Sequence, residues 1–227
     1  MYVYFLMLLL LYILSCFFEI YLFIVNVKFR SLSNNRRNYI IKNLLKSYIL
    51  FFYSIIGSYY LYQGYLLNNW NIKLLHNLGL VYASIDMFGL LTIRNLPFSS
   101  IFHHTVVQIL AFLHLYVEYP CNQLEINLLL LYTVCSSYSF MVNNYLGNRF
   151  IMNNTEVKDK VDIAYFSYIL LCLVNWVIHY YYLIINFNNL NLPILGYYAL
   201  IHIIIYDDIN LITFLNYNRK KLIRQLS

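Results

Sequence analysis

Long apolar runs, separated by short polar stretches, follow one another along the whole chain. An α-helix rises 1.5 Å per residue, so about 20 apolar residues cross the ~30 Å hydrocarbon layer of a bilayer. Runs of this kind predict helices at 2–26, 47–66, 74–93, 99–117, 124–142, 162–186 and 192–215. The pattern therefore predicts an all-α fold, a polytopic membrane bundle of about seven transmembrane helices.

The basic residues predict the orientation of this bundle. Of the 15 Lys and Arg residues, all except Lys73 fall in alternate connections between the predicted helices: in 27–46, at Arg94, in 143–161 and after residue 215. Lys and Arg gather in cytoplasmic loops of membrane proteins. We therefore expect the N-terminus outside and the C-terminus in the cytoplasm.

Composition supports a membrane protein and narrows its partners. With 62% hydrophobic and 11% charged residues, the chain has too few polar residues to cover a water-soluble core of this size. The net charge of +6 indicates topology and contact with anionic lipids, because the basic stretch 27–46 has few aromatic residues and no nucleic-acid motif. The four cysteines and six histidines lack the spacing of a zinc or di-iron site, so neither metal nor cofactor is expected.

Two apolar runs carry ionisable residues. His103 and His104 stand near the start of one, and Asp86 lies in the run before it. Such groups are costly in hydrocarbon unless they face a protein interior, a partner or water, so they are the first candidates for a functional site. Adjacent helical residues point about 100° apart. We expect His104, which shares a face with Gln108, to be the inward member of the pair.

The run with Asp86 also has a stripe of small residues. Gly79, Ala83 and Gly89 share a face with Asp86, and Tyr82 lies one turn before it. Such a stripe predicts the close approach of another helix. Asp86 is expected to lie deeper in the membrane than the histidines. A direct contact between them would therefore need a tilted helix, and a contact through a water molecule is easier.

The last predicted helix contains His202, Asp207, Asp208 and Asn210. Neighbouring carboxylates repel each other, so at least one should be protonated, hydrated or paired. The histidines of the fourth run are candidate partners. The sequence does not place the two helices side by side.

Four short motifs occur in an order that resembles the TLC family, named for TRAM, Lag and CLN proteins. The segment 82–86 (YASID) precedes FHH at 102–104, SSYSFMVN at 136–143 and NRF at 148–150, and Asn210 stands before a basic tail. The resemblance implies a first transmembrane helix and basic cytoplasmic loop (1–39), a TLC-like six-helix membrane domain (40–220) and a basic tail (221–227). Together with the polar positions of the predicted helices, it gives the following candidate residues of a lipid-binding or structural network: Tyr82, Gln108, Asn143, Arg149, His202, Asp207, Asp208 and Asn210.

Within this family, the chain looks more similar to TLC-domain proteins of lipid homeostasis than to ceramide synthases. The latter join an acyl-CoA to a sphingoid base and carry an acidic motif after the His-His pair. The corresponding stretch here, 132–144, has no acidic residue, and Asp207 and Asp208 do not replace it by position. The expected function is the binding or regulation of membrane lipids, in the endoplasmic reticulum or another endomembrane.

Alternatives remain open. A lipid N- or O-acyltransferase would use His103, His104 and Asp86 as catalytic residues, with His104 as a general base and acyl-CoA as a partner. A proton-coupled transporter would use Asp86, Asp207 and Asp208 as a relay, although no repeated halves are evident. Alternatively, the polar groups form a network that only locks the helices together.

Overall fold

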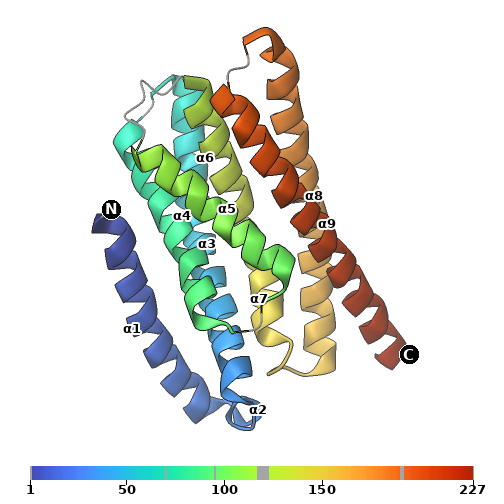
Figure 1. Ribbon diagram of the computed structural model, residues 1–227. Coiled ribbons are helices and arrows are strands. Elements are labelled where there is room, and N and C mark those ends of the chain that lie inside the picture. Colours follow the sequence, from blue (N-terminus) through green and yellow to red (C-terminus); the bar gives the residue numbers. More distant parts are fainter. Residues whose placement is uncertain (1, 70, 95, 117–122, 190–191, 227) are drawn as a thin grey trace.

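The computed structural model describes residues 2–69, 71–94, 96–116, 123–189 and 192–226. Within these ranges the chain is helical and has no strand (Figure 1). The elements are α1 (Tyr2–Val25), α2 (Val27–Arg30), α3 (Asn34–Leu67), α4 (Ile72–Thr92), α5 (Phe98–Tyr116), α6 (Gln123–Ser137), α7 (Phe140–Asn148), α8 (Asn154–Ile185), the 3₁₀-helix η1 (Phe187–Asn189) and α9 (Leu192–Leu226).

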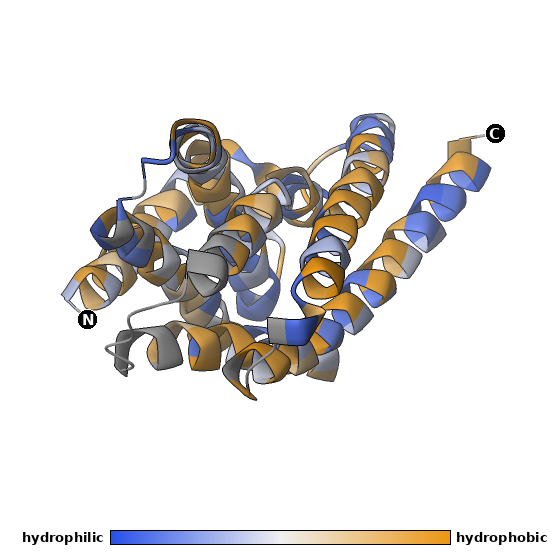
Figure 2. Cartoon of the chain, turned by 90° about the horizontal axis from the view of Figure 1, so that it is seen from above, coloured by the Kyte–Doolittle hydropathy of each residue, from blue (hydrophilic) through white to orange (hydrophobic). Residues whose placement is uncertain are grey.

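The helices run alternately up and down, with α6 and α7 together making one pass (Figure 1). Neighbours in the chain are often not neighbours in space, since α1 packs mainly against α4 and α3 mainly against α7. Of the described helices, α1, α3, α8 and α9 are long and apolar enough to cross a membrane, and α5 contains a shorter apolar stretch. The most apolar part of α1 has a mean hydropathy of 2.5, yet only 11% of it is buried in the bundle. Its outward apolar face suits a lipid surrounding, as in a helical membrane protein. Figure 2 shows apolar residues along the helices and more hydrophilic ones towards the C-terminal end of α9.

Helix α3 lies at the centre of the packing and contacts α1, α4, α6 and α7. It begins at Asn34, so the loop expected over 27–46 is wrong for its second half, and the expected domain boundary at 39/40 falls inside a helix. The polar and basic side chains of this segment disfavour contact with lipid chains, but they do not prevent the segment from forming a helix. Residues 40–47 are all buried, because this polar part of α3 packs inside the bundle rather than in a loop.

The expected loop over 143–161 and the expected basic tail are also largely helical. The helix expected over 124–142 is interrupted at residues 138 and 139, and α7 then extends to Asn148, so the connection to α8 is only 149–153. At the break, Ser47 on α3 donates a hydrogen bond to the Phe140 carbonyl oxygen at 2.8 Å. The basic tail is also helical, since α9 continues to Leu226.

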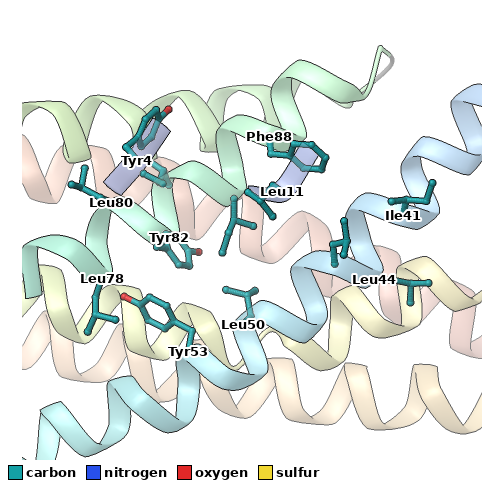
Figure 3. Packing of buried hydrophobic residues seen from close by; sticks show 14 of the residues in the cluster. Tyr4, Leu11, Ile41, Leu44, Leu50, Tyr53, Leu78, Leu80, Tyr82 and Phe88 are labelled. Carbon is teal, nitrogen blue, oxygen red and sulfur yellow. The ribbon is translucent and has the colours of Figure 1, made fainter. Parts of the chain in front are cut away.

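Buried apolar residues form two main clusters. The larger one joins residues of α1, α3, α4 and α5 with residues of α6 and α9, and Figure 3 shows part of it, including Leu11, Leu50 and Tyr82. The second one joins α7, α8 and the later part of α9 around residues such as Tyr145, Val161 and Leu215. Helix α9 therefore contributes to both clusters, and α3 and α7 are in contact between them.

Close helix approach depends on glycines other than those expected. A Cβ built on Gly147 of α7 would lie 2.6 Å from Leu44 Cγ and 3.3 Å from the Ile40 carbonyl oxygen of α3. At Gly79, by contrast, an added Cβ would meet nothing within 4 Å, and at Gly89 it would meet only the Lys42 side chain. The small-residue stripe on α4 is therefore not a helix-packing face at its two glycines.

We predict that Gly147→Ala destabilises the protein by about 1–3 kcal/mol, because the new methyl group forces α3 and α7 apart. The measurement is thermal unfolding of the detergent-solubilised chain. Gly196→Ala in α9 is the control, since a Cβ there meets nothing within 4 Å and alanine favours a helix by roughly 1 kcal/mol. Equal stability of the two variants would contradict the close α3–α7 packing.

Candidate functional site

A cavity of about 520 Å³ lies within the bundle. Among the described residues, its lining comes from α3 to α9, with no contribution from α1. It includes Tyr82 and Val142, one from each of the two apolar clusters, and so lies where the clusters meet. The volume is within the range of sites for small ligands or lipid head groups.

Asp86 is the most deeply buried charged residue beside this cavity, with an exposed fraction of 0%. The Lys46 ammonium of α3 lies 2.5 Å from its Oδ1 atom. Nδ1 of His104, on α5, lies 3.2 Å from its Oδ2 atom. Each carboxylate oxygen therefore has a nitrogen within 3.2 Å, and one aspartate connects α3, α4 and α5. The Asp86–His104 contact is direct rather than bridged by water.

His103 lies against His104, with ring centroids 5.4 Å apart, but it pairs with an acid of the last long helix. Its Nδ1 atom lies 3.2 Å from Oδ2 of Asp207 on α9, an ion pair whenever the imidazole is protonated. The two imidazole rings are inclined by 74°. The expected divergence of the histidines is confirmed. However, both histidines line the cavity, so the expectation of a single inward member is too narrow.

The neighbouring carboxylates of α9 also diverge. Asp208 Oδ1 accepts a hydrogen bond from the Tyr168 hydroxyl at 2.6 Å, and its Oδ2 accepts one from Trp176 Nε1 at 3.2 Å. Asp207 has His103 instead. Each carboxylate thus has partners on a different side of α9. This separation reduces the repulsion expected between neighbouring carboxylates.

The other predicted site residues divide into two groups. Tyr82, Asn143, Arg149 and Asn210 line the cavity with the histidines. His202 does not: it is exposed, and its Nε2 atom lies 3.0 Å from the Tyr180 hydroxyl. Its place in the expected network is wrong, because it projects from a different side of α9.

Gln108 has a structural role away from the cavity. Its Nε2 atom donates to the Ala83 carbonyl oxygen at 2.8 Å, and its Oε1 accepts from the Tyr4 hydroxyl at 2.7 Å. One buried amide thus fastens α5 to α4 and to α1, as the network interpretation expected.

Sequence reasoning missed the contribution of α3. Lys42 and Lys46 were expected in a cytoplasmic loop, yet both are buried and line the cavity. A signal was present: Tyr39, Lys42, Asn43 and Lys46 have the i, i+3, i+4, i+7 spacing of one helical face. The periodicity was overlooked because the basic residues of this segment were interpreted as a cytoplasmic loop.

The cluster also has the composition of a metal site. Asp86, His103 and His104 each offer a ligand atom within 4.8 Å of the others, and buried Asp86 Oδ2, His103 Nδ1 and His104 Nδ1 have no hydrogen bond of suitable geometry. Against a divalent cation stands the Lys46 ammonium on the same carboxylate, since like charges repel strongly in a buried site. The expectation of no metal stays a prediction. Chemically, the arrangement is suited to holding and moving protons between imidazole and carboxylate.

We predict that Asp86→Asn costs about 3 kcal/mol of unfolding free energy, because Lys46 is left as a buried charge without its partner. The double variant Lys46→Met/Asp86→Leu should cost less than the sum of its single changes, since no charge of the pair stays buried. Unfolding in detergent measures both. Asp162→Asn is the matched control: it breaks the more exposed Arg219–Asp162 pair and should cost at most about 1 kcal/mol. Similar losses in the two Asp→Asn variants would contradict the central role of Asp86.

Comparison with known proteins adds no family assignment. No protein-family model, no curated protein and no solved structure matches the chain. The resemblance to the TLC family therefore stays a prediction, and the function has to be argued from the geometry of the cavity.

Proposed function

We propose that this chain is a multi-pass membrane protein of TLC type that binds a membrane lipid, with the lipid's polar head group in the cavity. The observation that carries this proposal is a 520 Å³ cavity with both apolar residues and buried ionisable residues in its lining. A lipid head group needs polar partners, and the chains attached to it need apolar surface.

The surroundings of the cavity support a lipid rather than a soluble ligand. Four helices are long and apolar enough to cross a membrane, and α1, α8 and α9 leave most of their apolar residues unburied. Buried charges in such a bundle mark sites of function by default. Seven spans, a cytoplasmic C-terminus and an endomembrane location belong to this proposal.

Acyl transfer is a second candidate, favoured by one observation. Each histidine has its own carboxylate, His103 with Asp207 and His104 with Asp86, both at 3.2 Å. A carboxylate beside an imidazole orients the ring and stabilises its protonated form, as a general base requires. Such a base would take a proton from a lipid amine or hydroxyl that attacks the thioester carbon of an acyl-CoA; the C–S bond breaks, and coenzyme A leaves as a thiol with that proton. The stretch 132–144 has no acid, whereas Asp207 of α9 lies beside His103.

We predict that a bulky side chain in the cavity displaces bound lipid. Ser136→Phe, in the cavity wall, should remove most of the lipid that co-purifies with the detergent-solubilised chain. Leu170→Phe adds the same ring on the exposed face of α8 and should leave that lipid unchanged. Native mass spectrometry with lipid extraction makes the measurement, and unfolding temperatures establish that both variants are folded. Equal lipid content in the two variants would rule out the cavity as the binding site.

For the second candidate, membranes with the wild-type chain should form an acylated lipid from added acyl-CoA, and His104→Ala should abolish that product. His103→Ala should lower it as well, because both imidazoles have a carboxylate partner. Mass spectrometry of isotope-labelled acyl chains detects the product. The catalytic interpretation fails if both variants form as much product as the wild type, and lipid binding then remains.

A further inference from the structure

Lys42 is a buried basic residue that forms no ion pair with an acid among the described residues. Its exposed fraction is 6%, and it lines the cavity one turn before Lys46. The described part of the chain provides no hydrogen-bond partner for its amino group. Asp86 does not fill that role, because its two oxygens already contact Lys46 and His104. A buried charge without a partner is costly, so its presence calls for an explanation.

Helix α4, which packs opposite Lys42, leaves space for the lysine side chain. Gly89 of α4 leaves the room for its side chain: an added Cβ would lie 2.7 Å from Lys42 Cε and 3.1 Å from Nζ. Any larger residue at this position would shift the ammonium. The lysine therefore has a defined place against α4 at the edge of the cavity.

Arg149 is a second basic residue of the same cavity, and no carboxylate in the described ranges of the chain pairs with it. Its guanidinium lies over the rings of Tyr39, Phe150 and Phe214, at 5.4, 4.6 and 5.1 Å from their centroids. Its Nη2 donates to the Tyr39 hydroxyl at 3.3 Å, whereas the buried Nε has no hydrogen-bond partner. Aromatic faces hold the group in position but leave donor capacity and positive charge available.

The acids of the cavity are engaged elsewhere. Asp207 contacts His103, and Asp208 accepts hydrogen bonds from Tyr168 and Trp176, all on the α5, α8 and α9 side. Lys42 and Arg149 come from α3 and from the end of α7. The cavity is thus cationic towards α3 and α7 and acidic towards α9.

We propose that Lys42 and Arg149 form an anion subsite that binds a phosphate group of the ligand. Arginine presents a planar set of donors that suits phosphate oxygens, and lysine adds a compact charge. An anion placed there supplies the counter-charge that the protein lacks. The lipid origin of this phosphate rests on the proposed function, and the amine or hydroxyl end of the head group would then face the histidines and Asp207.

The test measures binding of short-chain phosphatidic acid, and of diacylglycerol with the same chains, to the full chain in non-ionic detergent. The wild type should prefer phosphatidic acid, and Lys42→Met should weaken that binding about tenfold while leaving diacylglycerol unchanged. Gly89→Ala, which keeps the charge but displaces it, should also weaken phosphatidic acid. Lys220→Met removes an exposed lysine of α9 and should have no effect.

Stability separates this role from a structural one. Removing a buried cation that has no partner should leave the unfolding temperature unchanged or raise it, whereas a lysine that holds the fold together would lower it. A Lys42→Met chain that binds phosphatidic acid as tightly as the wild type overturns the subsite. Equal binding of phosphatidic acid and diacylglycerol by the wild type would also overturn the subsite. If Ser136→Phe nevertheless abolishes binding of both lipids, the proposed lipid site is retained.

Two competitors identify the source of the phosphate. Displacement of phosphatidic acid by coenzyme A or inorganic phosphate at similar concentration supports the anion subsite but assigns it to a soluble ligand, which overturns its lipid origin. If a fatty acid competes with phosphatidic acid but neither phosphate compound does, the subsite binds a carboxylate, and the proposal that it binds phosphate is overturned. If neither lipid binds the wild type and only inorganic phosphate does, the proposed function fails while the subsite stands.

Discussion

Asp86 is the group on which the polar interior depends. Its two oxygens contact Lys46 of α3 and His104 of α5, so one carboxylate of α4 links three helices. Charges held away from water are tolerated only in such close arrangements. Without Asp86, the Lys46 ammonium and the His104 imidazole would be left without a carboxylate partner in an apolar bundle. Charge compensation at Asp86 therefore holds the α3, α4 and α5 part of the polar interior together.

Apolar packing then decides where this polar interior lies. One cluster unites α1, α3, α4 and α5 with parts of α6 and α9, and another unites α7, α8 and the later part of α9. Contact of α3 with α7 at Gly147 joins the two clusters, and residues of both line the cavity. His103 of α5 adds a polar contact with Asp207 of α9. Function and packing are linked here, since helices from both clusters line the proposed lipid site.

Much of the candidate site was predictable because helical periodicity is local. The apolar runs indicated an all-helical chain, and the cost of ionisable residues within them indicated Asp86 and the histidine pair. The divergence of His103 and His104 followed from the 100° step alone. Lys42 and Lys46 were missed because basic residues were assigned to a loop, and His202 was included because its helix face was not known. Both errors concern which face meets which neighbour.

The sequence by itself determined the helical class, the apolar surfaces and the identity of the groups that are costly to bury, because these depend on residue type and spacing along one helix. Only the tertiary structure decided the partners: Lys46 and His104 for Asp86, Asp207 for His103, and none for Lys42. Those pairings join residues up to about a hundred positions apart, and no local pattern encodes them. They follow from how the helices cross, which the packing of the whole bundle sets.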